Sequence, residues 1–143
     1  MMLKILLPTD GSDYALRAVR YLTEHVGWYR EPLEVHLLNV QLPIASGAVK
    51  MFISQQQLND YYREEGLKHL QQARSLLETS GVVYQHHIGV GELASTIVEY
   101  ATDKGCEMIL MGTRGRGALK GAMLGSVAMK VLHRAEVPVL LVR

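Results

Sequence analysis

The chain has 143 residues, 48% of them apolar and 20% charged, which fits one domain over 1–143 with a core that needs no disulfides. Its formal net charge of +1 excludes a bulk attraction to nucleic acid or to an acidic membrane surface, so neither is predicted as a partner. The chain has one cysteine and no apolar run approaching about 18 residues, which excludes an intrachain disulfide and a membrane span and predicts a cytoplasmic protein.

The first predicted elements are a strand and a helix. Residues 3–7 form an apolar run with little alternation, which is typical of a strand buried on both faces. Ser12 or Asp13 can cap a helix whose apolar positions recur at helical spacing as far as Val26. Gly27 is the predicted stop of that helix.

A second strand and a long helix follow. Residues 33–40 are apolar and rich in β-formers, which predicts a strand. Residues 41–54 contain proline, glycine and mixed polarity, so we interpret them as a long loop. A helical stripe then runs from Gln55 to about Thr79, and Gly81 ends it.

The last part of the chain alternates in the same way. Residues 82–90 and 107–111 predict strands, and a helix that Gly91 and Glu92 open lies between them. A further helix begins at Gly125–Ser126, and residues 137–142 predict a last strand. Cys106, just before a strand, is expected to be a small packed residue and not a nucleophile.

This alternation predicts an α/β fold: an open five-stranded parallel sheet with helices on both faces, Rossmann-like in type. Right-handed crossovers leave few topologies, of which we expect the strand order 3-2-1-4-5. In that order the winding reverses between the first and fourth strands, and ligands of open sheets bind at such a switch point.

Two unusual loops follow those two strands. One is Pro8-Thr9-Asp10-Gly11, and the other is the glycine-rich run over 112–121, after which a helix begins. Glycines let backbone N–H groups approach an anion, and a helix N-terminus adds unpaired N–H groups. Arg114, Arg116 and Lys120 can neutralise phosphate charge. For the glycines alone, an ordinary flexible loop with solvated basic residues is an equal alternative.

The spacing of the glycines separates these alternatives. The run matches neither a Walker loop nor a dinucleotide fingerprint. The spacing in this sequence is Gly112, two residues, Gly115, nine residues and then Gly125-Ser126. It resembles the signature G-x2-G-x9-G-[S/T], through which the universal stress protein family binds ATP. The resemblance extends to residues 4–12 and to the last strand, and it implies a fold like that of the adenine nucleotide alpha hydrolases. Glu107 stands where the family usually has aspartate, with no expected effect on the nucleotide.

The resemblance implies ATP in the crevice, with Mg²⁺ held through phosphate oxygens and water and with the carboxylate of Asp10 as a candidate ligand. Adenine would be walled by Pro8, Thr9 and Val40, the ribose would meet Met111 and Gly112, and the glycine-rich loop and the helix start would hold the phosphates. The predicted ATP-binding residues are Pro8, Thr9, Asp10, Val40, Met111, Gly112, Arg114, Gly115, Arg116, Gly125, Ser126 and Val127.

Simpler roles exist for some polar residues. Asp10 could only cap a turn with Gly11, and Ser126 could only be a helix N-cap. His86 and His87 are adjacent in a predicted strand and should point to opposite faces. No histidine has a zinc spacing, so no metal-binding histidine is expected.

No catalytic base is visible in the sequence, so binding with at most slow hydrolysis is favoured over turnover. We expect a nucleotide-dependent stress-response regulator. The alternatives are an ATPase or phosphotransferase that uses the same site, and a nucleotide-independent dimeric interaction protein. In the predicted order, 137–142 forms an edge strand, and antiparallel pairing with a second copy would cover it. The family resemblance implies the same homodimer.

Overall fold

The computed structural model describes residues 1–44, 47–115 and 123–143. Its elements, in chain order, are β1 (Leu3–Pro8), α1 (Asp13–Glu24), the 3-10 helix η1 (Val26–Trp28), β2 (Leu33–Gln41), α2 (Gly47–Phe52), α3 (Gln55–Ser80), β3 (Val83–Val90), α4 (Leu93–Asp103), β4 (Met108–Gly112), α5 (Ser126–Arg134) and β5 (Val139–Val142).

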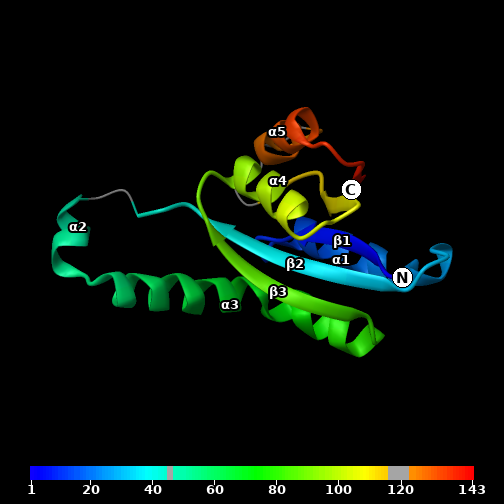
Figure 1. Ribbon diagram of the computed structural model, residues 1–143, viewed down its shortest axis with the longest axis horizontal. Coiled ribbons are helices and arrows are strands. Elements are labelled where there is room, and N and C mark those ends of the chain that lie inside the picture. Colours follow the sequence, from blue (N-terminus) through cyan, green and yellow to red (C-terminus); the bar gives the residue numbers. More distant parts are fainter. Residues whose placement is uncertain (45–46, 116–122) are drawn as a thin grey trace.

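The strands form one parallel sheet in the order β3-β2-β1-β4-β5, which confirms the predicted topology. Helices α1 and α3 cover one face, and α4 and α5 cover the other (Figure 1). The central strand β1 supplies both layers, since Ile5 and Leu7 pack towards α1 and α3 while Leu6 packs towards α4 and α5. All three side chains are fully buried, and each contributes on the order of 2 kcal/mol of hydrophobic stabilisation. This two-sided burial explains why the strand sequence is a continuous apolar run.

Several predicted bounds need correction. Helix α1 ends at Glu24, and Gly27, its predicted stop, lies inside η1. The predicted loop over 41–54 contains a short helix, α2, built largely from the helix-forming side chains of Ala48, Lys50 and Met51. Its six residues are too few to produce a readable periodicity. The last strand begins at Val139 and not at 137, although the carbonyl of Pro138 still accepts a hydrogen bond from Ile109 N.

Helix α3 is the longest element, and 26 residues give it a length of about 39 Å. The hydroxyl of Ser54 accepts the Gln57 N–H, and the Gln57 side chain accepts the Ser54 N–H, so a capping box begins the helix. Gly81 ends it in the left-handed conformation (φ 76°), as predicted. The N-terminal part of α3 extends beyond the sheet together with α2 (Figure 1). Within the described residues, no helix is long and apolar enough to span a membrane.

Candidate functional site

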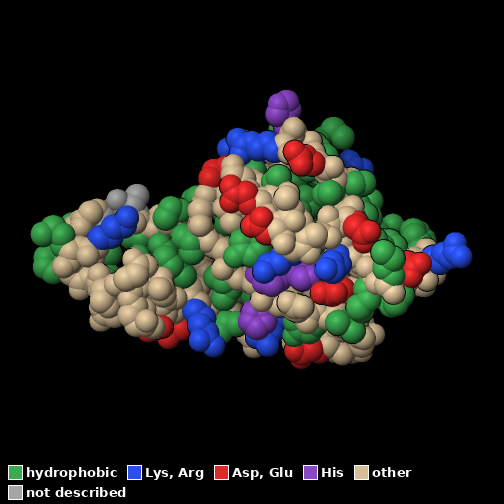
Figure 2. Space-filling model, viewed as in Figure 1, with side chains coloured by type: hydrophobic (Ala, Val, Ile, Leu, Met, Phe, Trp, Pro, Cys, Tyr) green, Lys and Arg blue, Asp and Glu red, His purple; other side chains and the backbone are tan. Residues whose placement is uncertain are grey.

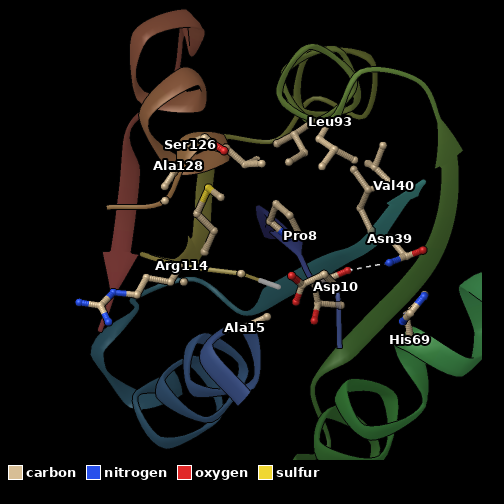
Figure 3. A pocket seen from close by; sticks show the side chains of 18 of the residues that line it. Pro8, Asp10, Ala15, Asn39, Val40, His69, Leu93, Arg114, Ser126 and Ala128 are labelled. Atoms are coloured by element: carbon tan, nitrogen blue, oxygen red, sulfur yellow. Dashed lines mark hydrogen bonds between the residues drawn. The ribbon is translucent and has the colours of Figure 1, made fainter. Parts of the chain in front are cut away.

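A pocket of about 470 Å³ lies at the carboxyl ends of β1, β2 and β4, where the sheet changes its winding direction (Figure 3). Its size is that of a small-molecule site. Every predicted ATP-binding residue that the structure describes lines it, whereas Arg116 and Lys120 lie outside the described residues. The predicted residues found there are Pro8, Thr9, Asp10, Val40, Met111, Gly112, Arg114, Gly115, Gly125, Ser126 and Val127.

One side of this pocket is apolar. Pro8 comes from β1 and Val40 from β2, and Leu93 of α4 lies across the opening from them (Figure 3). Ile97 of α4 also lines this pocket. Neither α4 residue was predicted from the sequence as part of a site. A wall of this kind suits a flat, weakly polar ring, because apolar contact favours it without demanding hydrogen bonds.

Asp10 both shapes a turn and faces the pocket. Its Oδ1 accepts the Ser12 N–H at 2.9 Å, and Gly11 follows it with φ 80°. The capping role that we considered as the alternative is therefore present, and Figure 3 shows that it is compatible with a carboxylate directed into the pocket. A Cβ on Gly115 would come within 2.5 Å of Asp10 Oδ2. Gly115 thus leaves the space that this carboxylate occupies.

Asn39 is a buried pocket residue that sequence reasoning missed. It lies near the end of β2, and its Nδ2 donates to the carbonyl of Thr9 at 2.9 Å. This bond ties the end of β2 to the loop after β1. A polar residue near the end of a strand beside the switch point was the available signal, but the apolar character of the strand masked it. His69 of α3 also lines the pocket and was not predicted there.

The start of α5 supplies backbone donors. Gly125 is its N-cap and offers no side-chain acceptor, so Ser126 is the first helical residue and its interpretation as an N-cap was wrong. Three other helices are capped by side chains, from Ser12 on α1, Ser54 on α3 and Glu92 on α4. Since the first N–H groups of a helix lack intrahelical partners, α5 presents an end that suits an anion.

The base of the glycine-rich loop is closed by a short bond. Gly125 N donates to the carbonyl of Thr113 at 2.7 Å, and Thr113 N donates to Val142 O at 3.0 Å. The end of β4 and the start of α5 are thereby held side by side. This closure brings the two halves of the predicted signature to one end of the pocket.

The charged group of Arg114 lies on an aromatic ring and not in the pocket. Its guanidinium lies over the ring of Tyr14, with Cζ 5.7 Å from the ring centroid, and Arg17 lies over the same ring at 5.2 Å. Figure 3 shows the side chain directed away from Asp10. The neutralisation of phosphate by Arg114 therefore stays a prediction. The observed position of the side chain does not favour it.

An ion-pair cluster joins the two helices that line the pocket. Glu92 Oε2, at the start of α4, accepts the Ser95 N–H at 2.7 Å and lies 3.0 Å from Nη1 of Arg134 on α5. The hydrogen bonds from Ser95, and then the charge of Arg134, lower the pKa of Glu92 to about 2. The pair is exposed to solvent, so it contributes little to the stability of the fold.

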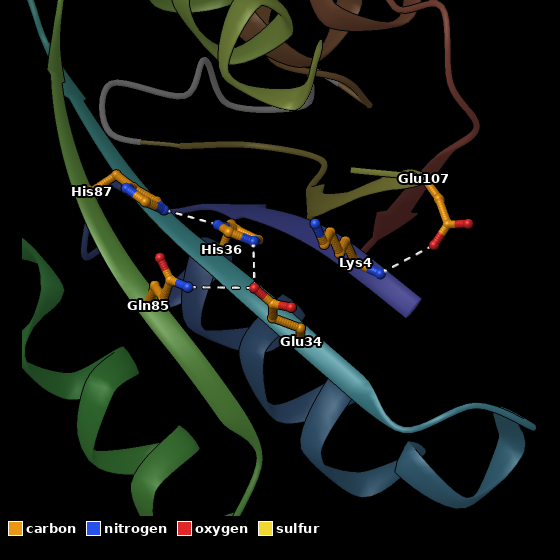
Figure 4. A network of polar contacts seen from close by, with 6 residues as sticks. All are labelled: Lys4, Glu34, His36, Gln85, His87 and Glu107. Atoms are coloured by element: carbon orange, nitrogen blue, oxygen red, sulfur yellow. Dashed lines mark hydrogen bonds and ion pairs between the residues drawn. The ribbon is translucent and has the colours of Figure 1, made fainter. Parts of the chain in front are cut away.

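A second polar cluster lies on the sheet away from the pocket (Figure 4). His36 Nδ1 is 2.9 Å from His87 Nε2, and His36 Nε2 is 3.1 Å from Glu34 Oε1. Burial lowers the pKa of His36 and lowers that of His87 to about 4. His87 meets His36 and lies beside Tyr100 of α4. Burial, and then the charges of Arg74 and Arg63 on α3, lower the pKa of His86, which confirms that the adjacent histidines point to opposite faces.

Cys106 and Glu107 lie at the opposite end of β4 from the pocket. The thiol is buried, which raises its pKa to about 11 and agrees with a packing role. Glu107 Oε2 accepts the Lys4 N–H at 3.2 Å. Across the part of the chain that the structure describes, no group of three or more His, Cys, Asp and Glu side chains could hold a metal ion.

These features define an open, parallel α/β protein with a small-molecule pocket at its topological switch point. The chain belongs to the universal stress protein family, whose model matches residues 1–143.

Two relatives come from Methanocaldococcus jannaschii. Universal stress protein MJ0531 is 32% identical over 98% of this chain and 81% of its own length. Universal stress protein MJ0577 is 30% identical over 100% of this chain and 96% of its own length. The solved structure of MJ0577 has a TM-score of 0.84 to this protein at 32% identity, covering 99% of this chain and 96% of the other.

Other solved structures share the fold at lower identity and contain adenine nucleotides. The Archaeoglobus fulgidus universal stress protein in complex with dAMP has a TM-score of 0.64 at 21% identity, over 100% of this chain and 98% of the other. An Arabidopsis thaliana family member with AMP bound has a TM-score of 0.65 at 19% identity, over 98% and 90%. At these identities the likeness establishes the fold alone.

Proposed function

We propose that this protein binds ATP, with Mg²⁺ on the phosphates, and acts as a nucleotide-dependent regulator in the stress response. The observation that carries the proposal is the position of the glycine signature: Gly112, Gly115 and Gly125-Ser126, separate in sequence, line one pocket at the switch point of the sheet. The adenine nucleotides bound to proteins of the same fold support the ligand class.

The two ends of the pocket suit the two ends of the ligand. Adenine would lie against the apolar wall formed by Pro8, Val40, Leu93 and Ile97. The phosphates would approach the N-terminal end of α5, where backbone N–H groups lack helical partners. Mg²⁺ would bind through phosphate oxygens and water, because Mg²⁺ seldom needs a complete set of protein ligands.

Binding is proposed with at most slow hydrolysis. Asp10 is the one carboxylate among the described residues that line the pocket. One of its oxygens already accepts the Ser12 N–H, which fits a structural carboxylate better than a base that activates water. A regulator that holds its nucleotide agrees with this chemistry.

A homodimer through β5 is part of the proposal. This strand lies at the edge of the sheet, and its residues Val139–Val142 are only partly buried in the single chain. An apolar edge strand favours pairing with another strand, and a second copy would pair isologously.

The proposal is tested by denaturing the purified protein, identifying any released nucleotide and following the γ-phosphate over time. Calorimetry with ATP and Mg²⁺ then gives the Kd. The absence of nucleotide, with no binding at millimolar ATP, would overturn the proposal, and rapid phosphate release would identify an enzyme instead.

A substitution tests the position of the site. Gly115→Val should weaken ATP binding at least about 100-fold, because its Cβ would lie within 2.5 Å of Asp10 Oδ2 and its branches would fill the phosphate end. Gly27→Val is the matched control, since a Cβ there meets nothing within 4 Å and Gly27 lies outside the pocket. Unchanged binding by Gly115→Val would show that the phosphates lie elsewhere.

A further inference from the structure

An arm projects from the body of this protein, and the proposed site does not use it. We define the arm as α2 together with residues 55–62 of α3, and Figure 1 shows it extending past the sheet. Its tip is apolar and open to solvent: Met51 is 83% exposed, and Phe52, the only phenylalanine of the chain, is 84% exposed. Figure 2 shows hydrophobic side chains gathered at this end of the molecule.

The root of the arm is also a wall of the pocket. Gln41 and Leu42, where β2 ends, line the switch-point pocket. Pro43 and Ile44, the next two residues, line a second cavity of about 350 Å³ between the arm and the end of β3. A ligand in the first pocket therefore contacts residues directly beside the chain segment that leads to the arm.

A chain of hydrogen bonds continues from the pocket floor into the arm. Asn39 donates to Thr9 O at 2.9 Å, and Gln41 Nε2 lies 3.3 Å from Asn39 Oδ1. The same Gln41 nitrogen donates to the carbonyl of Tyr62 at 2.7 Å. Tyr62 in turn accepts the Ile44 N–H on its hydroxyl at 2.8 Å. Tyr62 thus binds the root of the arm through both its backbone and its side chain.

In this arrangement, the contacts that a bound ligand makes depend on the position of the arm. Leu42 is 63% exposed, and a nucleotide in the pocket would cover it and restrain the Gln41 amide beside it. A ligand can shift a conformational equilibrium only through contacts that differ between the states. The Gln41 and Leu42 contacts are of that kind, because they depend on where the root lies.

We propose that occupancy of the nucleotide pocket sets the position and order of the arm through the Gln41–Tyr62–Ile44 linkage. The arm is then the part of the regulator whose position depends on the nucleotide. This inference rests on the proposed function for the identity of its ligand.

Hydrogen exchange of the full chain, with and without saturating ATP and Mg²⁺, tests the proposal. A six-residue helix opens easily, so its amides exchange fast enough for changes to be visible. In the wild-type protein, ATP should slow exchange over 47–60 and at the Ile44 amide at least about fivefold. Calorimetry on the same preparations gives the Kd.

Tyr62→Phe removes only the hydroxyl that accepts the Ile44 N–H and lies outside the nucleotide pocket. It should keep the ATP Kd within about twofold of wild type and lose most of the protection of the arm. Tyr61→Phe, a change of the neighbouring and exposed tyrosine, is the matched control and should behave like wild type.

The outcomes are distinguishable. No ATP binding by the wild-type protein would overturn the proposed function and, with it, the ligand of this device. ATP binding without altered exchange in the arm of the wild-type protein would overturn the inference alone, and that measurement needs no variant. Equal protection in Tyr62→Phe and in wild type would overturn the link from the Tyr62 hydroxyl to Ile44.

Discussion

Acidification should destabilise this fold through the histidine pair on β2 and β3. With Nδ1 of His36 2.9 Å from Nε2 of His87, one ring donates and the other accepts, which suits neutral rings. Two imidazolium rings would direct N–H groups at each other, and His36 is only 4% exposed. The surrounding charges are Glu34 beside His36, the cations Lys4 and Lys104, and His86, while Tyr100 packs against His87.

The sign and size of the effect follow from the lowered pKa of His87. In the unfolded chain the pKa of a histidine is about 6.5, whereas burial, and then the charge of His36, lowers it to about 4 in the folded protein. As the pH falls from about 6.5 to 4, the unfolded state binds the proton first, so the free energy of unfolding decreases. The difference corresponds to at most about 3 kcal/mol, and about 2 kcal/mol is expected because the ring is only half-buried.

Urea unfolding at pH 7, 6, 5 and 4 measures this loss. His87→Gln retains an N–H that can donate to His36. Between pH 7 and 4 the free energy of unfolding of this variant should decrease by about 2 kcal/mol less than that of wild type. His133→Gln alters an exposed histidine and should follow the wild-type curve. The carboxylates are common to all three proteins, so their titration cancels in the comparison. Parallel curves for wild type and His87→Gln would refute the reasoning.

Two further predictions concern the thiol and the edge strand. Cys106 should react with a thiol reagent at pH 8 at least about 100-fold more slowly in the native protein than in denaturant, because the thiol is buried and its pKa is about 11; equal rates would contradict its burial. Light scattering of the purified protein should give twice the chain mass of 16.0 kDa, since β5 leaves an unpaired edge; the mass of one chain at micromolar concentration would contradict pairing through β5.

The sheet could be predicted because its signals are local. Ile5, Leu6 and Leu7 are buried on both faces of β1, and a strand of this kind must be apolar throughout. Ser12 accepts the Ala15 N–H at the start of α1, as its place before a helical stripe indicated. Strands that alternate with helices then restrict the topology to few choices, and the order 3-2-1-4-5 is among them.

The features that were missed depend on contacts between distant residues. His69 reaches the pocket only because α3 packs beside β2, and its own helix shows no signal of a site. The hydrogen bond between Asn39 and Thr9 spans 30 residues. Likewise, the position of Arg114 depends on the Tyr14 ring, which α1 places beside the loop after β4. A pattern of residue types along the chain contains none of this information.

The position of Arg114 favours a backbone-based site over one built from basic side chains. If phosphate were held mainly by arginine, a guanidinium stacked on Tyr14 would weigh against the proposal. The signature, however, specifies glycines and one hydroxyl residue, which control how closely backbone N–H groups approach a ligand. Gly125 caps α5 without a side-chain acceptor, whereas the cap side chains of α1, α3 and α4 each accept one N–H of their own helix. The helix end that faces the pocket is thus left available to an anion. The glycine spacing is the sequence pattern that produces this backbone arrangement.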